Sequence, residues 1–201
     1  MNSFQTPRAR RAFAALLLLV AGLAWAVPAG AQEPIALALP DRPPIMVEAT
    51  TLDIRNADAS PTTYPYVTSR SPVTYDQAIK AWAAQRFKLT GGSVNTLRVT
   101  MRQGSIVEKL LPVTKGIKGW FKKDQNAEYT ATLDIEIAIV DPTGKVLTTA
   151  EGKSFATETI REDATSVDRT NTWLNLVKKT FDTLDSDLGA RMRTTMTGYV
   201  Q

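Results

Sequence analysis

Two acidic side chains with a spacing suited to acid and base chemistry lie in the second half of the chain. Asp134 and Glu136 are two residues apart in a run that alternates apolar and polar residues. On a strand both carboxylates lie on one face, about 7 Å apart, and such a pair can cleave a glycosidic bond. The alternative interpretation is that Asp134 and Glu136 are simply polar residues on a solvated face of the sheet. We favour this second interpretation because a half-buried sheet requires such a face.

A basic and aromatic segment offers binding chemistry. Residues 115–123 contain four lysines, no acid and three large apolar side chains. Aromatic rings settle at the headgroup level of a membrane, and each lysine near an anionic surface adds about 1 kcal/mol. One prediction is therefore contact with anionic lipid or lipopolysaccharide, and the other is a hairpin loop whose rings lie in the core. The candidate contact residues are Lys115, Lys118, Trp120, Phe121, Lys122 and Lys123.

A third candidate surface is the proline-rich loop that contains Tyr64, Pro65 and Tyr66. A rigid backbone with amphipathic rings suits the binding of a protein partner. Aromatic loop residues also cover the ends of sheets, and we favour this structural interpretation.

The chain of 201 residues contains neither histidine nor cysteine. This composition excludes disulfides, zinc sites built from those residues, and nucleophiles activated by histidine. We find no cofactor motif and expect no cofactor. The sequence favours a protein that is not an enzyme, and a hydrolase that uses Asp134 and Glu136 is the alternative.

Residues 1–31 have the three parts of a cleavable signal peptide. Three arginines precede an apolar run, and small residues lead up to Ala31. We predict cleavage after Ala31 and a periplasmic mature chain, exported by the general secretory or the twin-arginine route, of which we favour the first. No later segment approaches the 18 or so apolar residues of a transmembrane helix.

The basic character of the chain lies largely in this signal. Residues 1–31 hold three arginines and no acid, so their removal lowers the net charge from +4 to +1. A general affinity for nucleic acid therefore loses its main support, and we expect no nucleic-acid partner.

Periodicity predicts the elements of the mature chain. Residues 32–44 hold four prolines and form an extended lead-in, and residues 45–201 form one α+β domain. Helices begin at capping sequences that start with Thr74 and Thr165. Gly91 ends the first helix, and in the second Asp185 lies mostly off the apolar stripe. Strands cover residues 45–55, with a bulge near 49–51, then 97–111, with a kink at Gly104, 129–139 and 145–159.

The order is strand, helix, strand, strand, strand, helix. Residues 141–144 fit a type I turn that makes the last two strands antiparallel. A mainly antiparallel four-stranded sheet with both amphipathic helices on one face satisfies these patterns best.

This order of elements resembles the periplasmic auxiliary proteins of outer-membrane transport and lipopolysaccharide assembly, which pack two helices on a small sheet. The resemblance rests also on two stretches, residues 71–92 and residues 129–144. Many of those proteins are lipoproteins, whereas this chain has no cysteine for lipid attachment. The resemblance implies a bacterial cell-envelope accessory or binding protein with an envelope protein partner.

Overall fold

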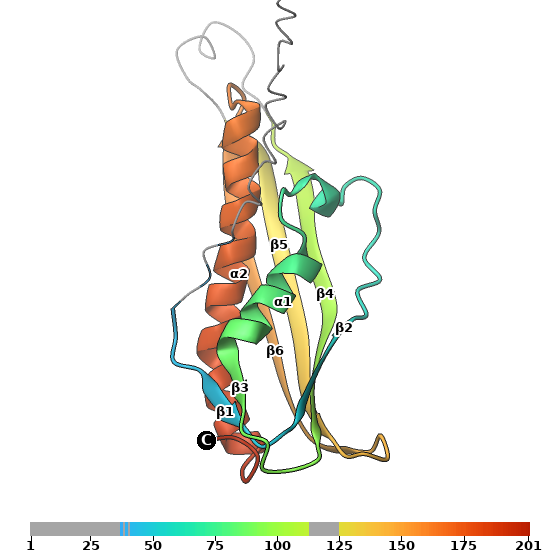
Figure 1. Cartoon of the computed structure of the whole chain (residues 1–201). Coiled ribbons are helices and arrows are strands. Elements are labelled where there is room, and N and C mark those ends of the chain that lie inside the picture. The colour runs from blue at the N-terminus through green and yellow to red at the C-terminus, as the bar shows by residue number, and fades with distance from the viewer. Residues whose placement is uncertain (1–36, 38, 40, 113–124) are drawn as a thin grey trace, which may run out of the picture. The chain divides into compact units, whose positions relative to one another are not determined.

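The computed structural model describes residues 37, 39, 41–112 and 125–201. Four strands make the main sheet in the order β2-β4-β5-β6, with bounds β2 (Thr51–Asn56), β4 (Thr96–Leu110), β5 (Gln125–Val140) and β6 (Val146–Arg161). The last three strands pair antiparallel, and β2 pairs parallel with β4. Helices α1 (Tyr75–Arg86) and α2 (Ser166–Thr195) both lie on one face of this sheet (Figure 1). The predicted α+β class and its mainly antiparallel sheet are confirmed.

The core forms between this sheet face and α2. Alternate residues of β5 are fully buried, and their neighbours are half-buried on the opposite face. The buried positions of α2 recur every three or four residues, so one stripe of the helix meets the sheet. The largest buried side chains at this interface include Tyr129, Leu133, Ile135, Leu176 and Phe181.

Both helices begin at the capping boxes predicted from the sequence. Thr74 accepts the backbone N–H of Gln77, whose side chain accepts the N–H of Thr74 in return. Thr165 and Asp168 make the same exchange at the start of α2. These bonds satisfy backbone donors that have no partner inside the helix, which explains why each helix starts where it does.

The first predicted helix ends earlier than expected. α1 stops at Arg86, and β3 (Phe87–Leu89) follows it directly. Phe87 packs edge-on against Trp82 with ring centroids 5.2 Å apart, and β3 pairs parallel with β1 (Ile45–Val47). Gly91 does adopt a positive φ of 71°, but it lies beyond β3. The prediction that Gly91 ends the helix is therefore wrong, because strand pairing and aromatic packing end it first.

The strand predicted over residues 45–55 is divided between two sheets. β1 pairs with β3, whereas β2 joins the main sheet beside β4. Ala49, which is fully buried, lies between the two strands. The change of alternation that predicted a bulge marks the point where the chain leaves one sheet for the other.

The irregularity of β4 lies at Arg102 instead of Gly104. The pairing of β4 with β5 shifts register between Met101 and Gln103, and the strand continues to Leu110. Gly104 has a different role, because a Cβ there would lie 2.8 Å from the Tyr75 side chain. The predicted kink at Gly104 is thus replaced by a bulge at Arg102 and a close contact at the glycine.

Candidate functional site

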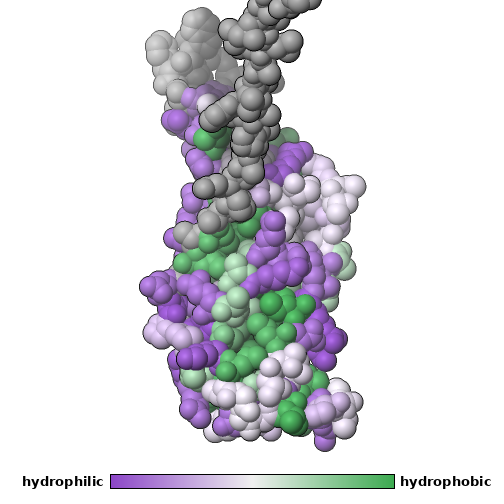
Figure 2. Space-filling view, in the orientation of Figure 1, coloured by the Kyte–Doolittle hydropathy of each residue, from purple (hydrophilic) through white to green (hydrophobic). Residues whose placement is uncertain are grey.

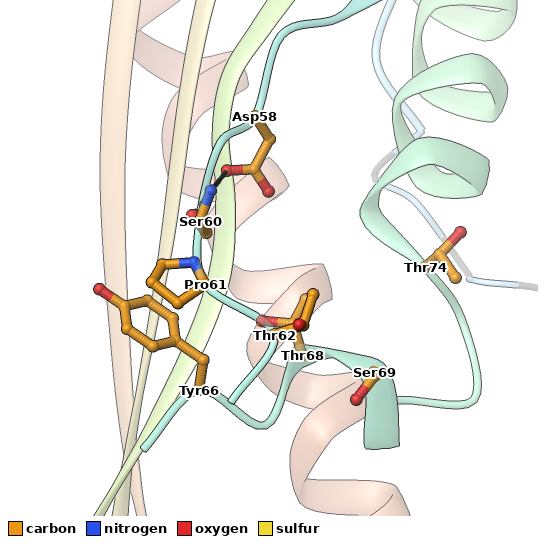
Figure 3. Close-up of a pocket in the computed structure, with 8 residues that line it drawn as sticks. All are labelled: Asp58, Ser60, Pro61, Thr62, Tyr66, Thr68, Ser69 and Thr74. Atoms are coloured by element: carbon orange, nitrogen blue, oxygen red, sulfur yellow. Dashed lines mark hydrogen bonds between the residues drawn. The ribbon is translucent and has the colours of Figure 1, made fainter. Parts of the chain in front are cut away.

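A pocket of about 180 Å³ lies between the loop that follows β2 and the start of α1 (Figure 3). Its walls come from the two ends of that loop and from the short 3₁₀ helix η1 (Thr68–Arg70). Five of its lining residues carry aliphatic hydroxyls, and a tyrosine, a proline and a carboxylate complete the set. The lining residues are Asp58, Ser60, Pro61, Thr62, Tyr66, Thr68, Ser69 and Thr74.

The loop that forms this pocket is held against the free edge of β4. Beyond Asn56, where β2 ends, Tyr66 bridges to Val107 in antiparallel orientation. The backbone N–H of Glu108 donates to the Pro65 carbonyl at 2.8 Å, and the N–H of Val67 donates to the Ile106 carbonyl at 2.8 Å. The loop therefore extends the sheet past the end of β2, which gives the pocket a fixed wall.

The loop thus pairs along the edge of the sheet, whereas the sequence favoured a loop that covers an end of the sheet. Part of it remains exposed. Tyr66 is half-buried, whereas Tyr64 is 59% exposed. Because residues 65–67 run antiparallel to β4, Tyr64 lies toward the Leu110 end of that strand. Leu110 is itself 61% exposed, so two large apolar side chains reach solvent at the same end of the sheet.

The carboxylate that lines the pocket orders its own loop. Ser60 donates its side-chain O–H to Asp58 Oδ1 at 2.6 Å, and the Ser60 backbone N–H donates to the same oxygen at 2.9 Å (Figure 3). This is a local turn in which the side chain of Asp58 orders its own backbone. The pocket thus offers methyl, ring and hydroxyl contacts, which suit recognition better than nucleophilic attack.

The structure places Asp134 and Glu136 together on the open face of the sheet, as the sequence predicts. Both accept bonds from one guanidinium: Arg102 Nε donates to Asp134 Oδ1 at 2.9 Å, and Arg102 Nη1 donates to Glu136 Oε2 at 3.5 Å. Glu151 completes the network at 2.9 and 3.1 Å. Its hydrogen bond raises the pKa of Arg102, and the same bond lowers the pKa of Glu151.

This network gives the carboxylate pair a structural role. The bulge in β4 turns Arg102 toward the two acids. A cavity of about 250 Å³ adjoins them, and the acids that line it, Asp134 and Glu151, are both paired with Arg102. Lys153 Nζ adds an ion pair with Asp134 at 3.8 Å. The interpretation as a solvated sheet face is favoured over the hydrolase.

Tyr129, at the start of the strand predicted over residues 129–139, is a buried tyrosine whose hydroxyl joins a polar network. It donates to Glu108 Oε1 at 2.7 Å and accepts from Arg169 Nη1 at 3.0 Å. Burial, with Glu108 as the second cause, raises the pKa of Tyr129. Its ring also packs edge-on against Trp173, so the group joins β4, β5 and α2.

Two segments with sequence predictions lie outside the described residues. The basic segment with Lys115, Lys118, Trp120, Phe121, Lys122 and Lys123 lies outside them, as does the predicted signal peptide. Within residues 41–112 and 125–201, no cluster of three acidic side chains could hold a metal ion. Neither helix of that region has the length and apolar character needed to span a membrane.

Apolar side chains also reach the surface that carries the helices. Figure 2 shows hydrophobic residues gathered along the middle of this face, between hydrophilic margins. Partly buried residues such as Leu39, Leu89 and Leu174 pack against the core at its edge. Partly exposed apolar side chains of this kind are ordinary on the surface of a small domain.

Comparisons with known proteins find fold-level similarity only. No family model matches the chain, and no curated protein sequence matches it. Among solved structures it is similar to rare lipoprotein B from Shewanella oneidensis, with 15% identity over 70% of this chain and 95% of that chain, at a TM-score of 0.36. It is also similar to a minor lipoprotein from Acinetobacter baumannii, with 13% identity over 72% and 92% of the two chains, at a TM-score of 0.35. Both similarities are weak, and both of these solved structures carry the name of a lipoprotein.

Proposed function

We propose that this chain is an exported, non-catalytic binding protein of the bacterial cell envelope, which contacts anionic lipid and an envelope protein partner. In this proposal residues 1–31 are removed on export, residues 32–44 form a lead-in and residues 45–201 form the binding domain. One contact surface is the end of the sheet where β4 finishes. We call this surface the β4 end, and it comprises Tyr64, Lys109 and Leu110. The basic segment of residues 115–123, which follows Leu110 in the sequence, is the second proposed lipid contact.

The exposure of Leu110 carries the proposal. It is 61% exposed and lies next to Lys109, whose side chain is 71% exposed although it pairs with Glu128 at 3.6 Å. This combination of an apolar and a cationic side chain directly precedes the segment that holds Trp120, Phe121 and four lysines. Apolar groups that enter the headgroup region together with lysines that face it are the usual means of peripheral attachment.

Tyr64 supports the same surface from a second part of the chain. It is exposed on a loop fixed by two backbone hydrogen bonds to β4, so little conformational entropy is lost when it binds. Tyrosine is suited to an interface because its ring is apolar and its hydroxyl remains polar. The adjoining pocket of Figure 3 could receive a side chain of a protein partner.

Vesicle flotation tests the lipid contact. The processed chain, recovered from the envelope, should float with vesicles that contain phosphatidylglycerol, and the bound fraction should fall as salt rises because screening weakens the lysine contribution. Exchange of Trp120 and Phe121 for serine, or Leu110→Ser alone, should reduce binding with little change in melting temperature. Val94→Ser is the matched control, since Val94 is 74% exposed but precedes the opposite end of β4.

Two results would contradict the lipid contact. One is the absence of flotation by the parent protein at low salt. The other is a large loss of stability when Trp120 and Phe121 are changed, which would mean that the rings lie in the core.

Mass spectrometry tests the export. Protein recovered from the envelope should have an intact mass that begins at Gln32. Recovery of only the full-length chain from the cytosol would contradict the periplasmic location.

A further inference from the structure

A second cavity, of about 240 Å³, lies beside α2, and three of its eight lining residues are arginines. Three segments meet there: the lead-in, the last residue of α1, and one face of α2. Its charged residues are Arg42, Arg86, Arg193 and Asp185. We call this the arginine cavity.

One carboxylate organises the cavity. Asp185 is 2% exposed and accepts Arg86 Nε at 2.6 Å and Trp82 Nε1 at 3.3 Å on the same oxygen. Its other oxygen lies 3.0 Å from Arg42 Nε. This carboxylate neutralises a single positive charge, while three guanidinium groups line the cavity.

The arginine cavity therefore holds an excess of positive charge. Arg193 has no acidic partner within the described residues, and its Nη1 makes only a 3.4 Å bond to the Gly189 carbonyl. Arg42 already pairs with Asp185 through Nε, and its side chain is 38% exposed. A guanidinium without an acidic partner beside a cavity offers its donors to an anion.

The small residues of α2 leave room for such an anion. Gly189 and Ala190 line the cavity one turn beyond Asp185, and Arg193 follows one turn later. A Cβ at position 189 would lie 2.9 Å from Arg86 Nη2, so the glycine leaves the space that this guanidinium occupies. Ser186 provides a hydroxyl on the same wall.

We propose that the arginine cavity binds a phosphate group. Guanidinium groups present paired donors that match the oxygens of phosphate, and an anion with two negative charges balances the excess charge of the cavity. The group can be free inorganic phosphate or the phosphate of a small ester. The site is independent of the β4 end and needs no lipid contact there.

Isothermal titration calorimetry with the purified protein tests this site. Inorganic phosphate and glycerol 3-phosphate serve as probes, against sodium chloride at matched ionic strength. At least one probe should bind saturably and raise the melting temperature, whereas chloride should do neither. Stronger binding of inorganic phosphate would identify the free ion, and stronger binding of glycerol 3-phosphate would identify an ester.

The variants Arg193→Gln and Arg42→Gln localise the binding. Each should weaken it about tenfold or more, because each removes a charged donor to the phosphate. Arg193 makes no ion pair within the described residues, so R193Q should remain folded. Arg191→Gln is the matched control: it removes the same charge from the same helix outside the cavity and should change affinity less than twofold.

Three outcomes would overturn the proposal. They are the absence of binding by both probes, an equal effect of chloride, and undiminished phosphate affinity in both R193Q and R42Q. None of these results bears on flotation with lipid vesicles, so this proposal and the proposed envelope function succeed or fail separately.

Discussion

Arg86 and Asp185, 99 residues apart in the chain, form a buried ion pair with 2.6 Å between Nε and Oδ1. The pair joins the end of α1 to the middle of α2, and Trp82 donates to the same oxygen from within α1. A buried charge is tolerated only when it is paired and hydrogen-bonded, so each partner depends on the other.

Removal of Asp185 should therefore destabilise the fold strongly. Asp185→Ala leaves Arg86 charged and buried without its partner, which should lower the free energy of unfolding by about 3–5 kcal/mol. Urea unfolding measures the loss. Asp76→Ala is the control, because Asp76 pairs with Lys80 at the surface and its loss should cost less than about 1 kcal/mol. Equal effects of the two substitutions would contradict the buried role of Asp185.

A side chain at position 104 should clash with α1. The Cβ of Gly104→Ala would lie 2.8 Å from Tyr75 and from Met101 Sδ, and relief of this contact should cost about 1–3 kcal/mol. Thermal unfolding measures the change. Gly92→Ala should have little effect, because its Cβ would meet its nearest neighbour at 3.6 Å. An unchanged melting temperature for G104A would mean that β4 and α1 are not in contact as described.

A charge in the sheet-facing stripe of α2 should disrupt the core. Leu184 is 1% exposed and packs near Gly152 of β6, so Leu184→Asp buries a carboxylate without a partner and should cost more than about 3 kcal/mol. Val167→Asp places the same charge on the same helix where the side chain is 64% exposed, and it should be nearly neutral. Chemical denaturation of both variants compares the two faces. Similar stability of the two would show that the stripe does not pack on the sheet.

The cap of α2 should make stability depend on pH in the acid range. Two hydrogen bonds from Thr165 hold the pKa of Asp168 below its ordinary value of 3.8. The larger contribution comes from the backbone N–H and the smaller from the hydroxyl. The folded state thus binds this proton less readily than the unfolded state. The stabilisation is complete well above pH 3.8 and is lost as pH falls through the lower pKa of the folded protein.

Urea midpoints measured from neutral to acid pH test this cap. The difference between the parent and Asp168→Asn should shrink as pH falls below 3.8. Asp187→Asn, which changes the same charge far from the N-terminus of α2, should not reproduce this pattern. A difference that is constant over the whole range would rule out ionisation of Asp168 as its source.

Features encoded over a few residues could be predicted from the sequence. The capping boxes at Thr74 and Thr165 and the hairpin turn that starts at Asp141 depend on hydrogen bonds between residues at most four apart. The alternation of β5 and the stripe of α2 likewise follow from local periods. Together these patterns predicted the α+β class, and they placed Asp134 and Glu136 on one face.

Features that depend on distant partners were decided by tertiary structure alone. The prediction that Asp185 lies mostly off the apolar stripe is wrong, because the residue is buried beside Leu184. Its burial depends on Arg86, Arg42 and Trp82, which are all more than 90 residues away in the chain. The parallel pairing of β1 with β3 ends α1 before its glycine, and the bulge at Arg102 joins the two predicted carboxylates to Glu151. Local sequence determines which conformations a segment favours. Burial of a charge and pairing of a short strand depend on groups that only the folded chain brings together.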